Sequence, residues 1–139
     1  MDQLNLVWIN KNLLGLAFLW MYLTVMLIGL QIKGEIKDIF YKPGKFLNAS
    51  LDKASEENER NYYKIEESKS GETIIVVQIA GLIARRIVTQ TAKNQIVHQG
   101  QRIGMIRFGS RVDVYFTKRK TLVKVGQNVI AGESLIAGF

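Results

Sequence analysis

The chain has 139 residues, 47% of them hydrophobic, and a formal net charge of +7, which suits one domain or one domain with an appendage. It contains no cysteine and one histidine, His98. This composition excludes disulfides, thiol chemistry, cysteine-ligated metals and histidine-rich metal sites. Most of the positive charge follows residue 33, and a basic domain favours anionic partners such as nucleic acid or membrane head groups.

The N-terminal segment contains a long apolar run. Leu13 to Leu30 is uncharged and has about the minimum length for a helix crossing a ~30 Å hydrocarbon core. A signal peptide fits less well because no small-residue cleavage site follows the run, and a buried helix would need a larger domain around it. We expect residues 1–33 to hold a membrane helix. The lysines that follow it predict that the domain over 34–139 lies on the cytoplasmic side.

The rest of the chain predicts a mostly β fold. Phe46 to Arg60 is polar and is expected to form a loop with at most one helical turn. Alternating or β-branched apolar residues predict strands at Glu35–Phe40, Tyr62–Glu67, Thr73–Ile79 and Ile83–Val88, with a hairpin turn at Ser68–Glu72.

A weak internal repeat links two later segments, Gln95–Gly104 (QIVHQGQRIG) and Gln127–Ile136 (QNVIAGESLI). Each copy reads as a strand, a glycine turn, a polar residue and a second strand. Two copies in a small domain predict a quasi-symmetric β-sandwich or barrel-sandwich, as in biotinyl and lipoyl carrier domains. Neither copy has a lysine at its glycine turn, so we do not expect a carrier role.

The segment RFGSRVD, residues 107–113, places Gly109 and Ser110 between two arginines inside a strand-like run. The pair predicts either a tight turn or a bond that is cleaved. Together with GKFLNASLDKASEENERN (44–61), VQIAGLIARRIV (77–88) and GQRIGMIRFGSRVDVYF (100–116), it resembles phosphatidylserine decarboxylase of the short bacterial and archaeal type. The resemblance runs from about Gly34 to the C-terminus, with the motifs in family order and spacing.

The resemblance implies a proenzyme that cuts itself between Gly109 and Ser110. The products would be a β chain, 1–109, and an α chain, 110–139, in which Ser110 becomes a pyruvoyl group. This ketone would form a Schiff base with the substrate amine and accept the electrons left by carbon dioxide, without a metal. The implied reaction converts phosphatidylserine to phosphatidylethanolamine at the cytoplasmic membrane. The implied partners are anionic membrane lipid and the chain's own halves; a homo-oligomer is left open, and nucleic acid is not expected.

Other side chains are weaker candidates for the site. We expect Asn48, Ser50, Arg85 and Arg86 to shape the pocket. Guanidinium groups suit a substrate phosphate, so Arg102, Arg107 and Arg111 are alternatives, although each also fits an ion pair or a solvated strand face. We expect Asp113 to pair with an arginine rather than assist processing, His98 to lie on the surface, and the run 118–120 to form an exposed loop or touch lipid.

The sequence departs from the family before Gly34. Relatives carry an Ala-Asp-Gly segment and a stretch like FMDVFxxHVNR there, implied to supply a carboxylate and a histidine. If Leu19–Gly29, LWMYLTVMLIG, is back-translated and read one base earlier, suitable codons give FMDVFNCHVNR. We hypothesise that the apolar segment is a frame-shifted reading of that strand. Two alternatives stay open for the whole chain: an inactive, truncated remnant of the family, and a membrane-anchored basic binding module.

Overall fold

A computed structural model describes residues 5–9, 32–83, 85–106, 109–124, 127 and 135–138. This part of the chain is mostly β, as predicted. Its elements are β1 (Asn5–Ile9), β2 (Gly34–Lys42), α1 (Ala54–Glu57), β3 (Arg60–Glu67), β4 (Thr73–Ile79), β5 (Ile87–Thr89), β6 (Ile96–Val97), β7 (Gly104–Ile106), β8 (Arg111–Phe116), β9 (Lys120–Thr121) and β10 (Ala137–Gly138). The helix expected over 13–30 lies outside the described residues. Within them, no helix is long and apolar enough to span a bilayer.

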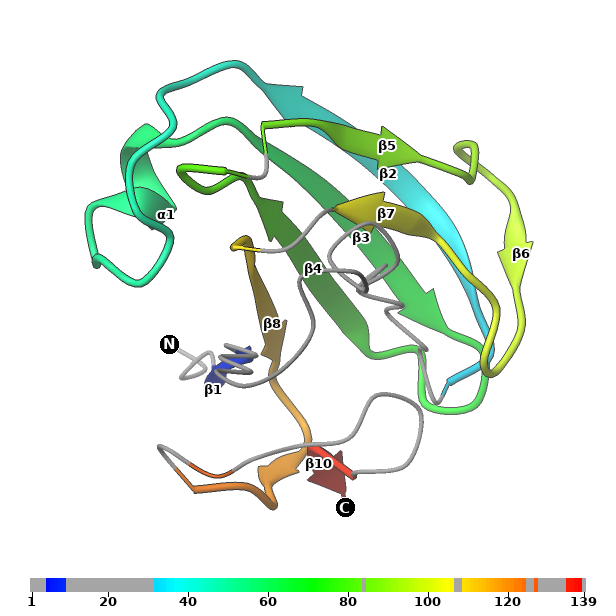
Figure 1. Ribbon diagram of the computed structural model, residues 1–139. Helices are drawn as coiled ribbons and strands as arrows, with labels where there is room; N and C mark the ends of the chain where they lie inside the picture. Colours follow the sequence, from blue (N-terminus) through cyan, green and yellow to red (C-terminus); the bar gives the residue numbers. More distant parts are fainter. Residues whose placement is uncertain are drawn as a thin grey trace.

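Six strands form one curled antiparallel sheet in the order β1-β8-β4-β3-β2-β6 (Figure 1). Its centre is the hairpin of β3 and β4, in which Tyr63 pairs with Val76. Strand β8 pairs with β4 on one side and β1 on the other. Because β8 begins at Arg111, the residues that follow Ser110 form an inner strand of the sheet.

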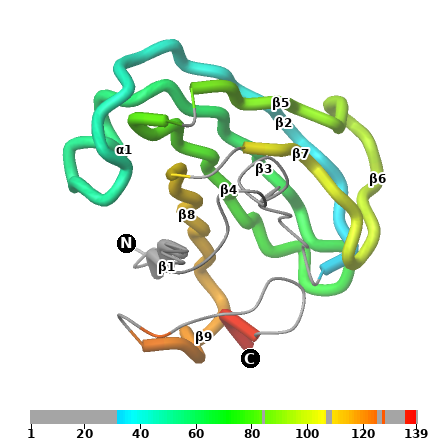
Figure 2. The backbone as a smooth tube through the Cα atoms, in the orientation of Figure 1, coloured from blue at the N-terminus to red at the C-terminus, as the bar shows by residue number. Residues whose placement is uncertain are grey.

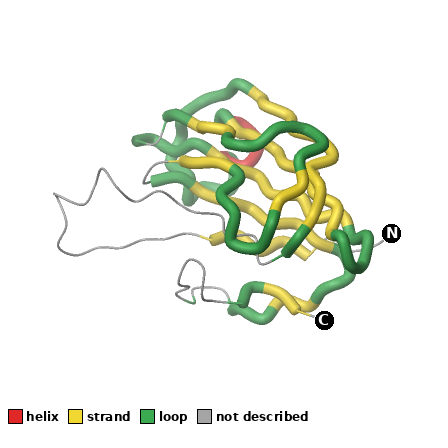
Figure 3. The backbone as a smooth tube through the Cα atoms, turned by 90° about the vertical axis from the view of Figure 1, so that its right-hand side faces the viewer, coloured by secondary structure: helices red, strands yellow, loops and turns green. Residues whose placement is uncertain are grey.

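One face of the sheet carries the hydrophobic core. Alternate residues of the paired strands point to the same side, and the fully or nearly buried ones are Ile36, Tyr63, Ile65, Ile74, Val76, Val112 and Phe116. The β5–β7 pair lies across β2 and β3 on this side (Figure 2). The Thr89 hydroxyl contacts the sheet through Asn61 Nδ2 at 3.1 Å and the Tyr63 hydroxyl at 3.4 Å. The view turned by 90° shows most of the strands gathered side by side, joined by loops (Figure 3).

A buried ionic cluster joins the β3–β4 turn to the segment after β8. Glu72, with no exposed side-chain surface, accepts hydrogen bonds from the backbone N–H of Thr117 and Lys118 at 2.9 and 2.7 Å. Arg119 pairs with Glu72 at 2.9 Å and with Glu67 at 2.5 Å, and its side chain is 11% exposed. The prediction that the basic run 118–120 is an exposed loop is therefore wrong for Arg119, because two carboxylates distant in sequence hold it.

The strand predictions succeed for most of the alternating or β-branched apolar runs. Thr73–Ile79 is confirmed with the predicted bounds, Tyr62–Glu67 lies within β3, and α1 is the single helical turn expected in the polar loop. The strand predicted at Ile83–Val88 is confirmed only at Ile87 and Val88, which lie in β5; its bounds are wrong, since Ile83, Arg85 and Arg86 precede the strand. The first repeat copy contains β6 and a glycine turn, while most of the second copy lies outside the described residues.

Candidate functional site

A turn precedes β8 at the predicted cleavage position. Gly109 has a φ of +81°. This value lies in the left-handed region, where any residue with a Cβ is strained. Gly109 is exposed, whereas Ser110 is 9% exposed. Gly109 lies in a turn, which is one of the two interpretations of the Gly-Ser pair; cleavage of the bond stays a prediction. The turn places the amide bond between an exposed glycine and a nearly buried serine.

The carbonyl of Gly109 packs directly on the backbone of Gly81. Strands β4 and β8 pair Ile79 with Arg111, and continuing this antiparallel register brings Gly81 opposite Gly109. A Cβ placed on Gly81 would lie 1.7 Å from the Gly109 carbonyl oxygen and 2.8 Å from its carbonyl carbon. The only side chain that fits between these two backbones is a hydrogen atom.

The loop over 45–51 lies against the same contact. The Ala49 Cβ is 3.3 Å from the position that a Cβ of Gly81 would take. Asn58, which is 1% exposed, ties this loop to the end of β4. Its Nδ2 donates to the carbonyls of Leu47 and Ala80 at 2.8 and 2.7 Å, and its Oδ1 accepts from the Leu47 N–H at 2.9 Å. The motifs 44–61, 77–88 and 100–116 thus meet at one place.

Asn48 and Ser50 are brought close to the turn by their shared loop, with Ala49 between them. Their polar atoms bond to each other. The Asn48 Oδ1 accepts from the Ser50 N–H at 3.1 Å and from the Ser50 hydroxyl at 2.9 Å. This Asx-type turn shapes the loop. A role of either residue in a substrate pocket stays a prediction.

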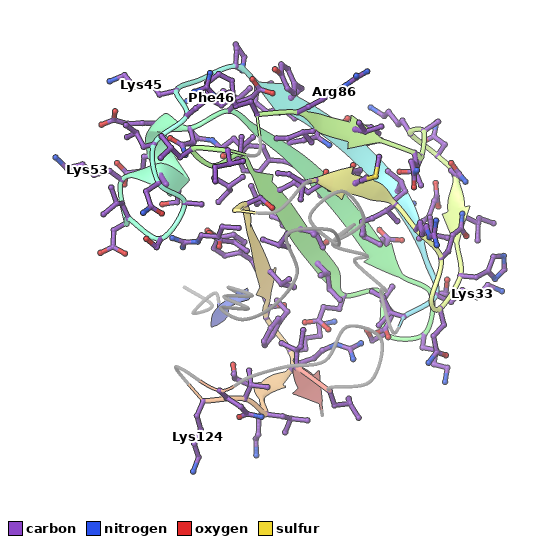
Figure 4. All side chains as sticks on the ribbon, in the orientation of Figure 1. Lys33, Lys45, Phe46, Lys53, Arg86 and Lys124 are labelled. Carbon is purple, nitrogen blue, oxygen red and sulfur yellow. The ribbon has the colours of Figure 1, made fainter. Side chains whose placement is uncertain are left out.

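Arg85 and Arg86 are predicted to lie on a strand, but both lie in the loop before β5. The Arg85 guanidinium lies 5.5 Å from the centre of the Phe46 ring, and its Nε donates to the Leu82 carbonyl at 3.2 Å. Arg86 is exposed and directly precedes β5, and Figure 4 places it apart from Lys53 on the α1 loop. The chain leaves the sheet where Gly81 contacts Gly109, and the next residues, Leu82 and Ile83, are exposed by 57% and 70%.

Asp113 pairs with Arg111, as expected. Arg111 Nε and Nη2 donate to the two carboxylate oxygens at 2.6 and 3.0 Å, and both side chains are buried. Burial raises the pKa of Asp113, and hydrogen bonds from Arg111 and Tyr115 oppose the rise only in part. Arg111 is therefore held in a buried ion pair rather than on a solvated strand face. His98 is exposed, as predicted.

Gly81 and Asn58 were not singled out from the sequence. Both lie inside the motifs that carry the family resemblance, but a glycine bears no reactive group and an asparagine in a polar loop looks like a solvated turn. The available signal was the position of Gly81 two residues after a buried strand, where glycine marks close approach of another backbone. Among the residues that the structure describes, no group of three or more acidic or histidine side chains could hold a metal ion.

Comparison with known proteins identifies the family to which the chain belongs. The family model for phosphatidylserine decarboxylase matches residues 25–137. A phosphatidylserine decarboxylase proenzyme from Pelagibacter ubique is 70% identical over 105 residues, covering 76% of this chain and 48% of the relative. One from Nitrobacter winogradskyi is 53% identical over 109 residues, covering 78% and 44%. No solved structure matches. The chain spans about half the length of these curated relatives, and it belongs to the phosphatidylserine decarboxylase family.

Proposed function

We propose that this chain carries the self-cleaving and pyruvoyl-forming part of a phosphatidylserine decarboxylase, with Gly109–Ser110 as the bond that is cut. The observation that carries the proposal is the turn at this bond. A glycine with positive φ lies against the backbone of Gly81, and a nearly buried serine follows it at the start of an inner strand. The relatives' names, as proenzymes of this enzyme, support the same chemistry.

The self-cleavage begins with an acyl shift. The Ser110 Oγ forms a bond to the carbonyl carbon of Gly109, the amide C–N bond breaks, and the hydroxyl proton ends on the freed amine of Ser110. In the second step, a base removes the Ser110 Cα proton and the Cβ–O bond breaks, so residues 1–109 leave with a C-terminal carboxylate. Water then hydrolyses the resulting dehydroalanine, releasing ammonia and leaving a pyruvoyl group on Arg111.

The residues present fit a pyruvoyl group. Ser110 supplies the carbon atoms of the group, and the inner strand β8, which begins at the next residue, holds the group in place after the cut. When formed, the pyruvoyl ketone supplies an electrophilic carbonyl and an electron sink for decarboxylation. Arg111 and Asp113 keep the start of β8 fixed through their paired hydrogen bonds. Since both Asp113 oxygens face Arg111, we do not assign Asp113 as the base.

The proposed substrate is phosphatidylserine, and the product is phosphatidylethanolamine. The proposed location is the cytoplasmic face of the cytoplasmic membrane, supported by the lipid substrate and the apolar run over 13–30. The domain over 34–139 is proposed to share the barrel-sandwich fold of its family, which its mostly β, layered structure supports. Asn48, Ser50, Arg85 and Arg86 remain the proposed pocket residues. The arginines are exposed on the segment that follows Gly81.

A second candidate is an uncut remnant with the same fold. An intact Gly109–Ser110 bond in the purified chain would distinguish it.

Activity on lipid tests the proposal. The purified chain is incubated with vesicles containing phosphatidylserine, and phosphatidylethanolamine is measured by mass spectrometry, with Ser110→Ala as the control. We expect product from the chain with Ser110 and none from Ser110→Ala. Equal product, or no product from either chain, would contradict the assignment of Ser110 in this chain. Loss of activity after borohydride treatment would independently support a ketone.

A further inference from the structure

We infer that Gly81 and Asn58 are positioning residues for the self-cleavage: Gly81 sets where the Gly109 carbonyl lies, and Asn58 fixes Gly81. The inference rests on the proposed function, because it concerns the bond that is proposed to break. It adds two residues that take no part in the bond chemistry themselves.

The first observation is the contact between the two glycines. The Gly109 carbonyl carbon is the atom that Ser110 would attack, and the position of a Cβ on Gly81 overlaps the oxygen of that carbonyl at 1.7 Å. The φ of Gly81 lies outside the left-handed region. Glycine is therefore required at 81 by contact and not by backbone conformation.

The second observation is that the Gly81 backbone cannot easily move away. The Ala80 carbonyl, which belongs to the peptide leading into Gly81, accepts from Asn58 Nδ2 at 2.7 Å. The Ala80 N–H donates to the Glu59 carbonyl at 2.9 Å. The Ala49 Cβ lies 3.3 Å from the same Cβ position and also crowds it. Hydrogen bonds from Asn58 and to Glu59 thus hold the peptide before Gly81 in place, and the Gly109 carbonyl packs against Gly81.

This arrangement restricts the direction from which the carbonyl can be attacked. A nucleophile must approach the carbonyl carbon from above its plane, so the orientation of the C=O decides whether Ser110 can reach it. A methyl group on Gly81 must push the oxygen outward by about 1 Å or more before ordinary contact is restored, and a misplacement of that size costs roughly 100-fold in rate.

The test compares two glycine variants. Intact mass spectrometry gives the rate of cleavage, and the urea midpoint gives the stability of each variant. Gly81→Ala adds a methyl group at the contact. Gly100→Ala is the matched control: Gly100 has a φ of +76° and nothing within 4 Å of its Cβ position. The control substitution therefore strains the backbone and lowers stability without touching the turn. We expect Gly81→Ala to cut roughly 100-fold more slowly and Gly100→Ala to cut at the rate of the unmodified chain.

A second pair of variants tests the anchor. Asn58→Asp keeps the size of the side chain but replaces the donor Nδ2, which serves two carbonyls, by an acceptor. We expect cleavage to slow by roughly 10-fold, because the displacement is smaller than that caused by a methyl group. Asn94→Asp is the control, since Asn94 is exposed in a distant turn.

Hydroxylamine identifies the step that is affected, because it cleaves the ester formed by the acyl shift and leaves amides intact. We expect no hydroxylamine-sensitive ester in Gly81→Ala. Cleavage of this variant at the normal rate, or accumulation of ester in it, would overturn the inference. If Gly81→Ala does not fold, normal cleavage of Asn58→Asp would overturn it. An unmodified chain with neither cut nor ester would instead overturn the proposed function, and the inference with it.

Discussion

Removing the charge of Glu72 should weaken the whole fold, because its carboxylate joins the β3–β4 turn to the segment after β8. Its side chain has no exposed surface and accepts three hydrogen bonds, from the Thr117 N–H, the Lys118 N–H and Arg119 Nε, at 2.7 to 2.9 Å. Glu72→Gln keeps the shape. It replaces one oxygen by an amide donor, which would face either the N–H groups of Thr117 and Lys118 or the Nε of Arg119.

The expected cost follows from the burial. Breaking a buried ion pair by removing one partner costs about 3–5 kcal/mol. The glutamine still accepts with one oxygen, so we expect about 2–3 kcal/mol. For a chain of this length, that loss lowers the melting temperature by roughly 10 °C.

The measurement is urea and thermal unfolding in the Ser110→Ala background, which keeps every molecule uncut. Glu66→Gln is the matched control on the same strand pair. Glu66 is about half exposed and lies 3.6 Å from Lys37, so its substitution should change the midpoint little. Equal midpoints for Glu72→Gln and Glu66→Gln would refute the claim that the buried cluster holds the two segments together.

Three further predictions concern pH, the core and the gene. Burial alone would raise the pKa of Glu67, but hydrogen bonds to neighbouring side chains, Arg119 among them, outweigh it and the pKa is lowered. A carboxyl group with a lowered folded-state pKa stabilises the fold while it is ionised, so the free energy of unfolding should fall as the pH drops through and below the usual glutamate pKa. Urea titrations of Glu67→Gln should show a flatter pH dependence, and an unchanged slope would contradict the assignment. Ile65 is fully buried in the core, so Ile65→Ala should lower the free energy of unfolding by about 2–5 kcal/mol. The loss is measured from the urea midpoint, and a loss under about 1 kcal/mol would contradict the place of Ile65 in the core. The nucleotides encoding residues 19–29 should read FMDVF and HVNR one base earlier, and sequencing that finds otherwise ends the frame-shift hypothesis.

The parts of the fold that the sequence predicts are those set by local pattern. The β-branched run Thr73–Ile79 is buried along most of its length, so its composition alone marks a strand. The turn at Ser68–Glu72 follows because two strand-like runs flank a polar stretch with a glycine. The Gly-Ser pair inside a strand-like run allows either a turn or a cleaved bond, and the structure shows a turn at Gly109.

The parts that the sequence does not predict depend on distant partners. Leu82 and Ile83 look like strand residues but are exposed, because the chain leaves the sheet where Gly81 contacts Gly109. Arg119 looks like part of a solvated basic run, and only the folded chain brings Glu67 and Glu72 to it. No local pattern encodes such contacts, since each joins residues far apart in the sequence.

The most direct test is the intact mass of the purified chain under denaturing conditions. We expect two species, residues 1–109 and residues 110–139, the smaller carrying a pyruvoyl group and no free N-terminal amine. Fragmentation of the smaller species would place the ketone on the residue derived from Ser110. A single uncut chain of 15.8 kDa would contradict self-cleavage and would favour the inactive remnant.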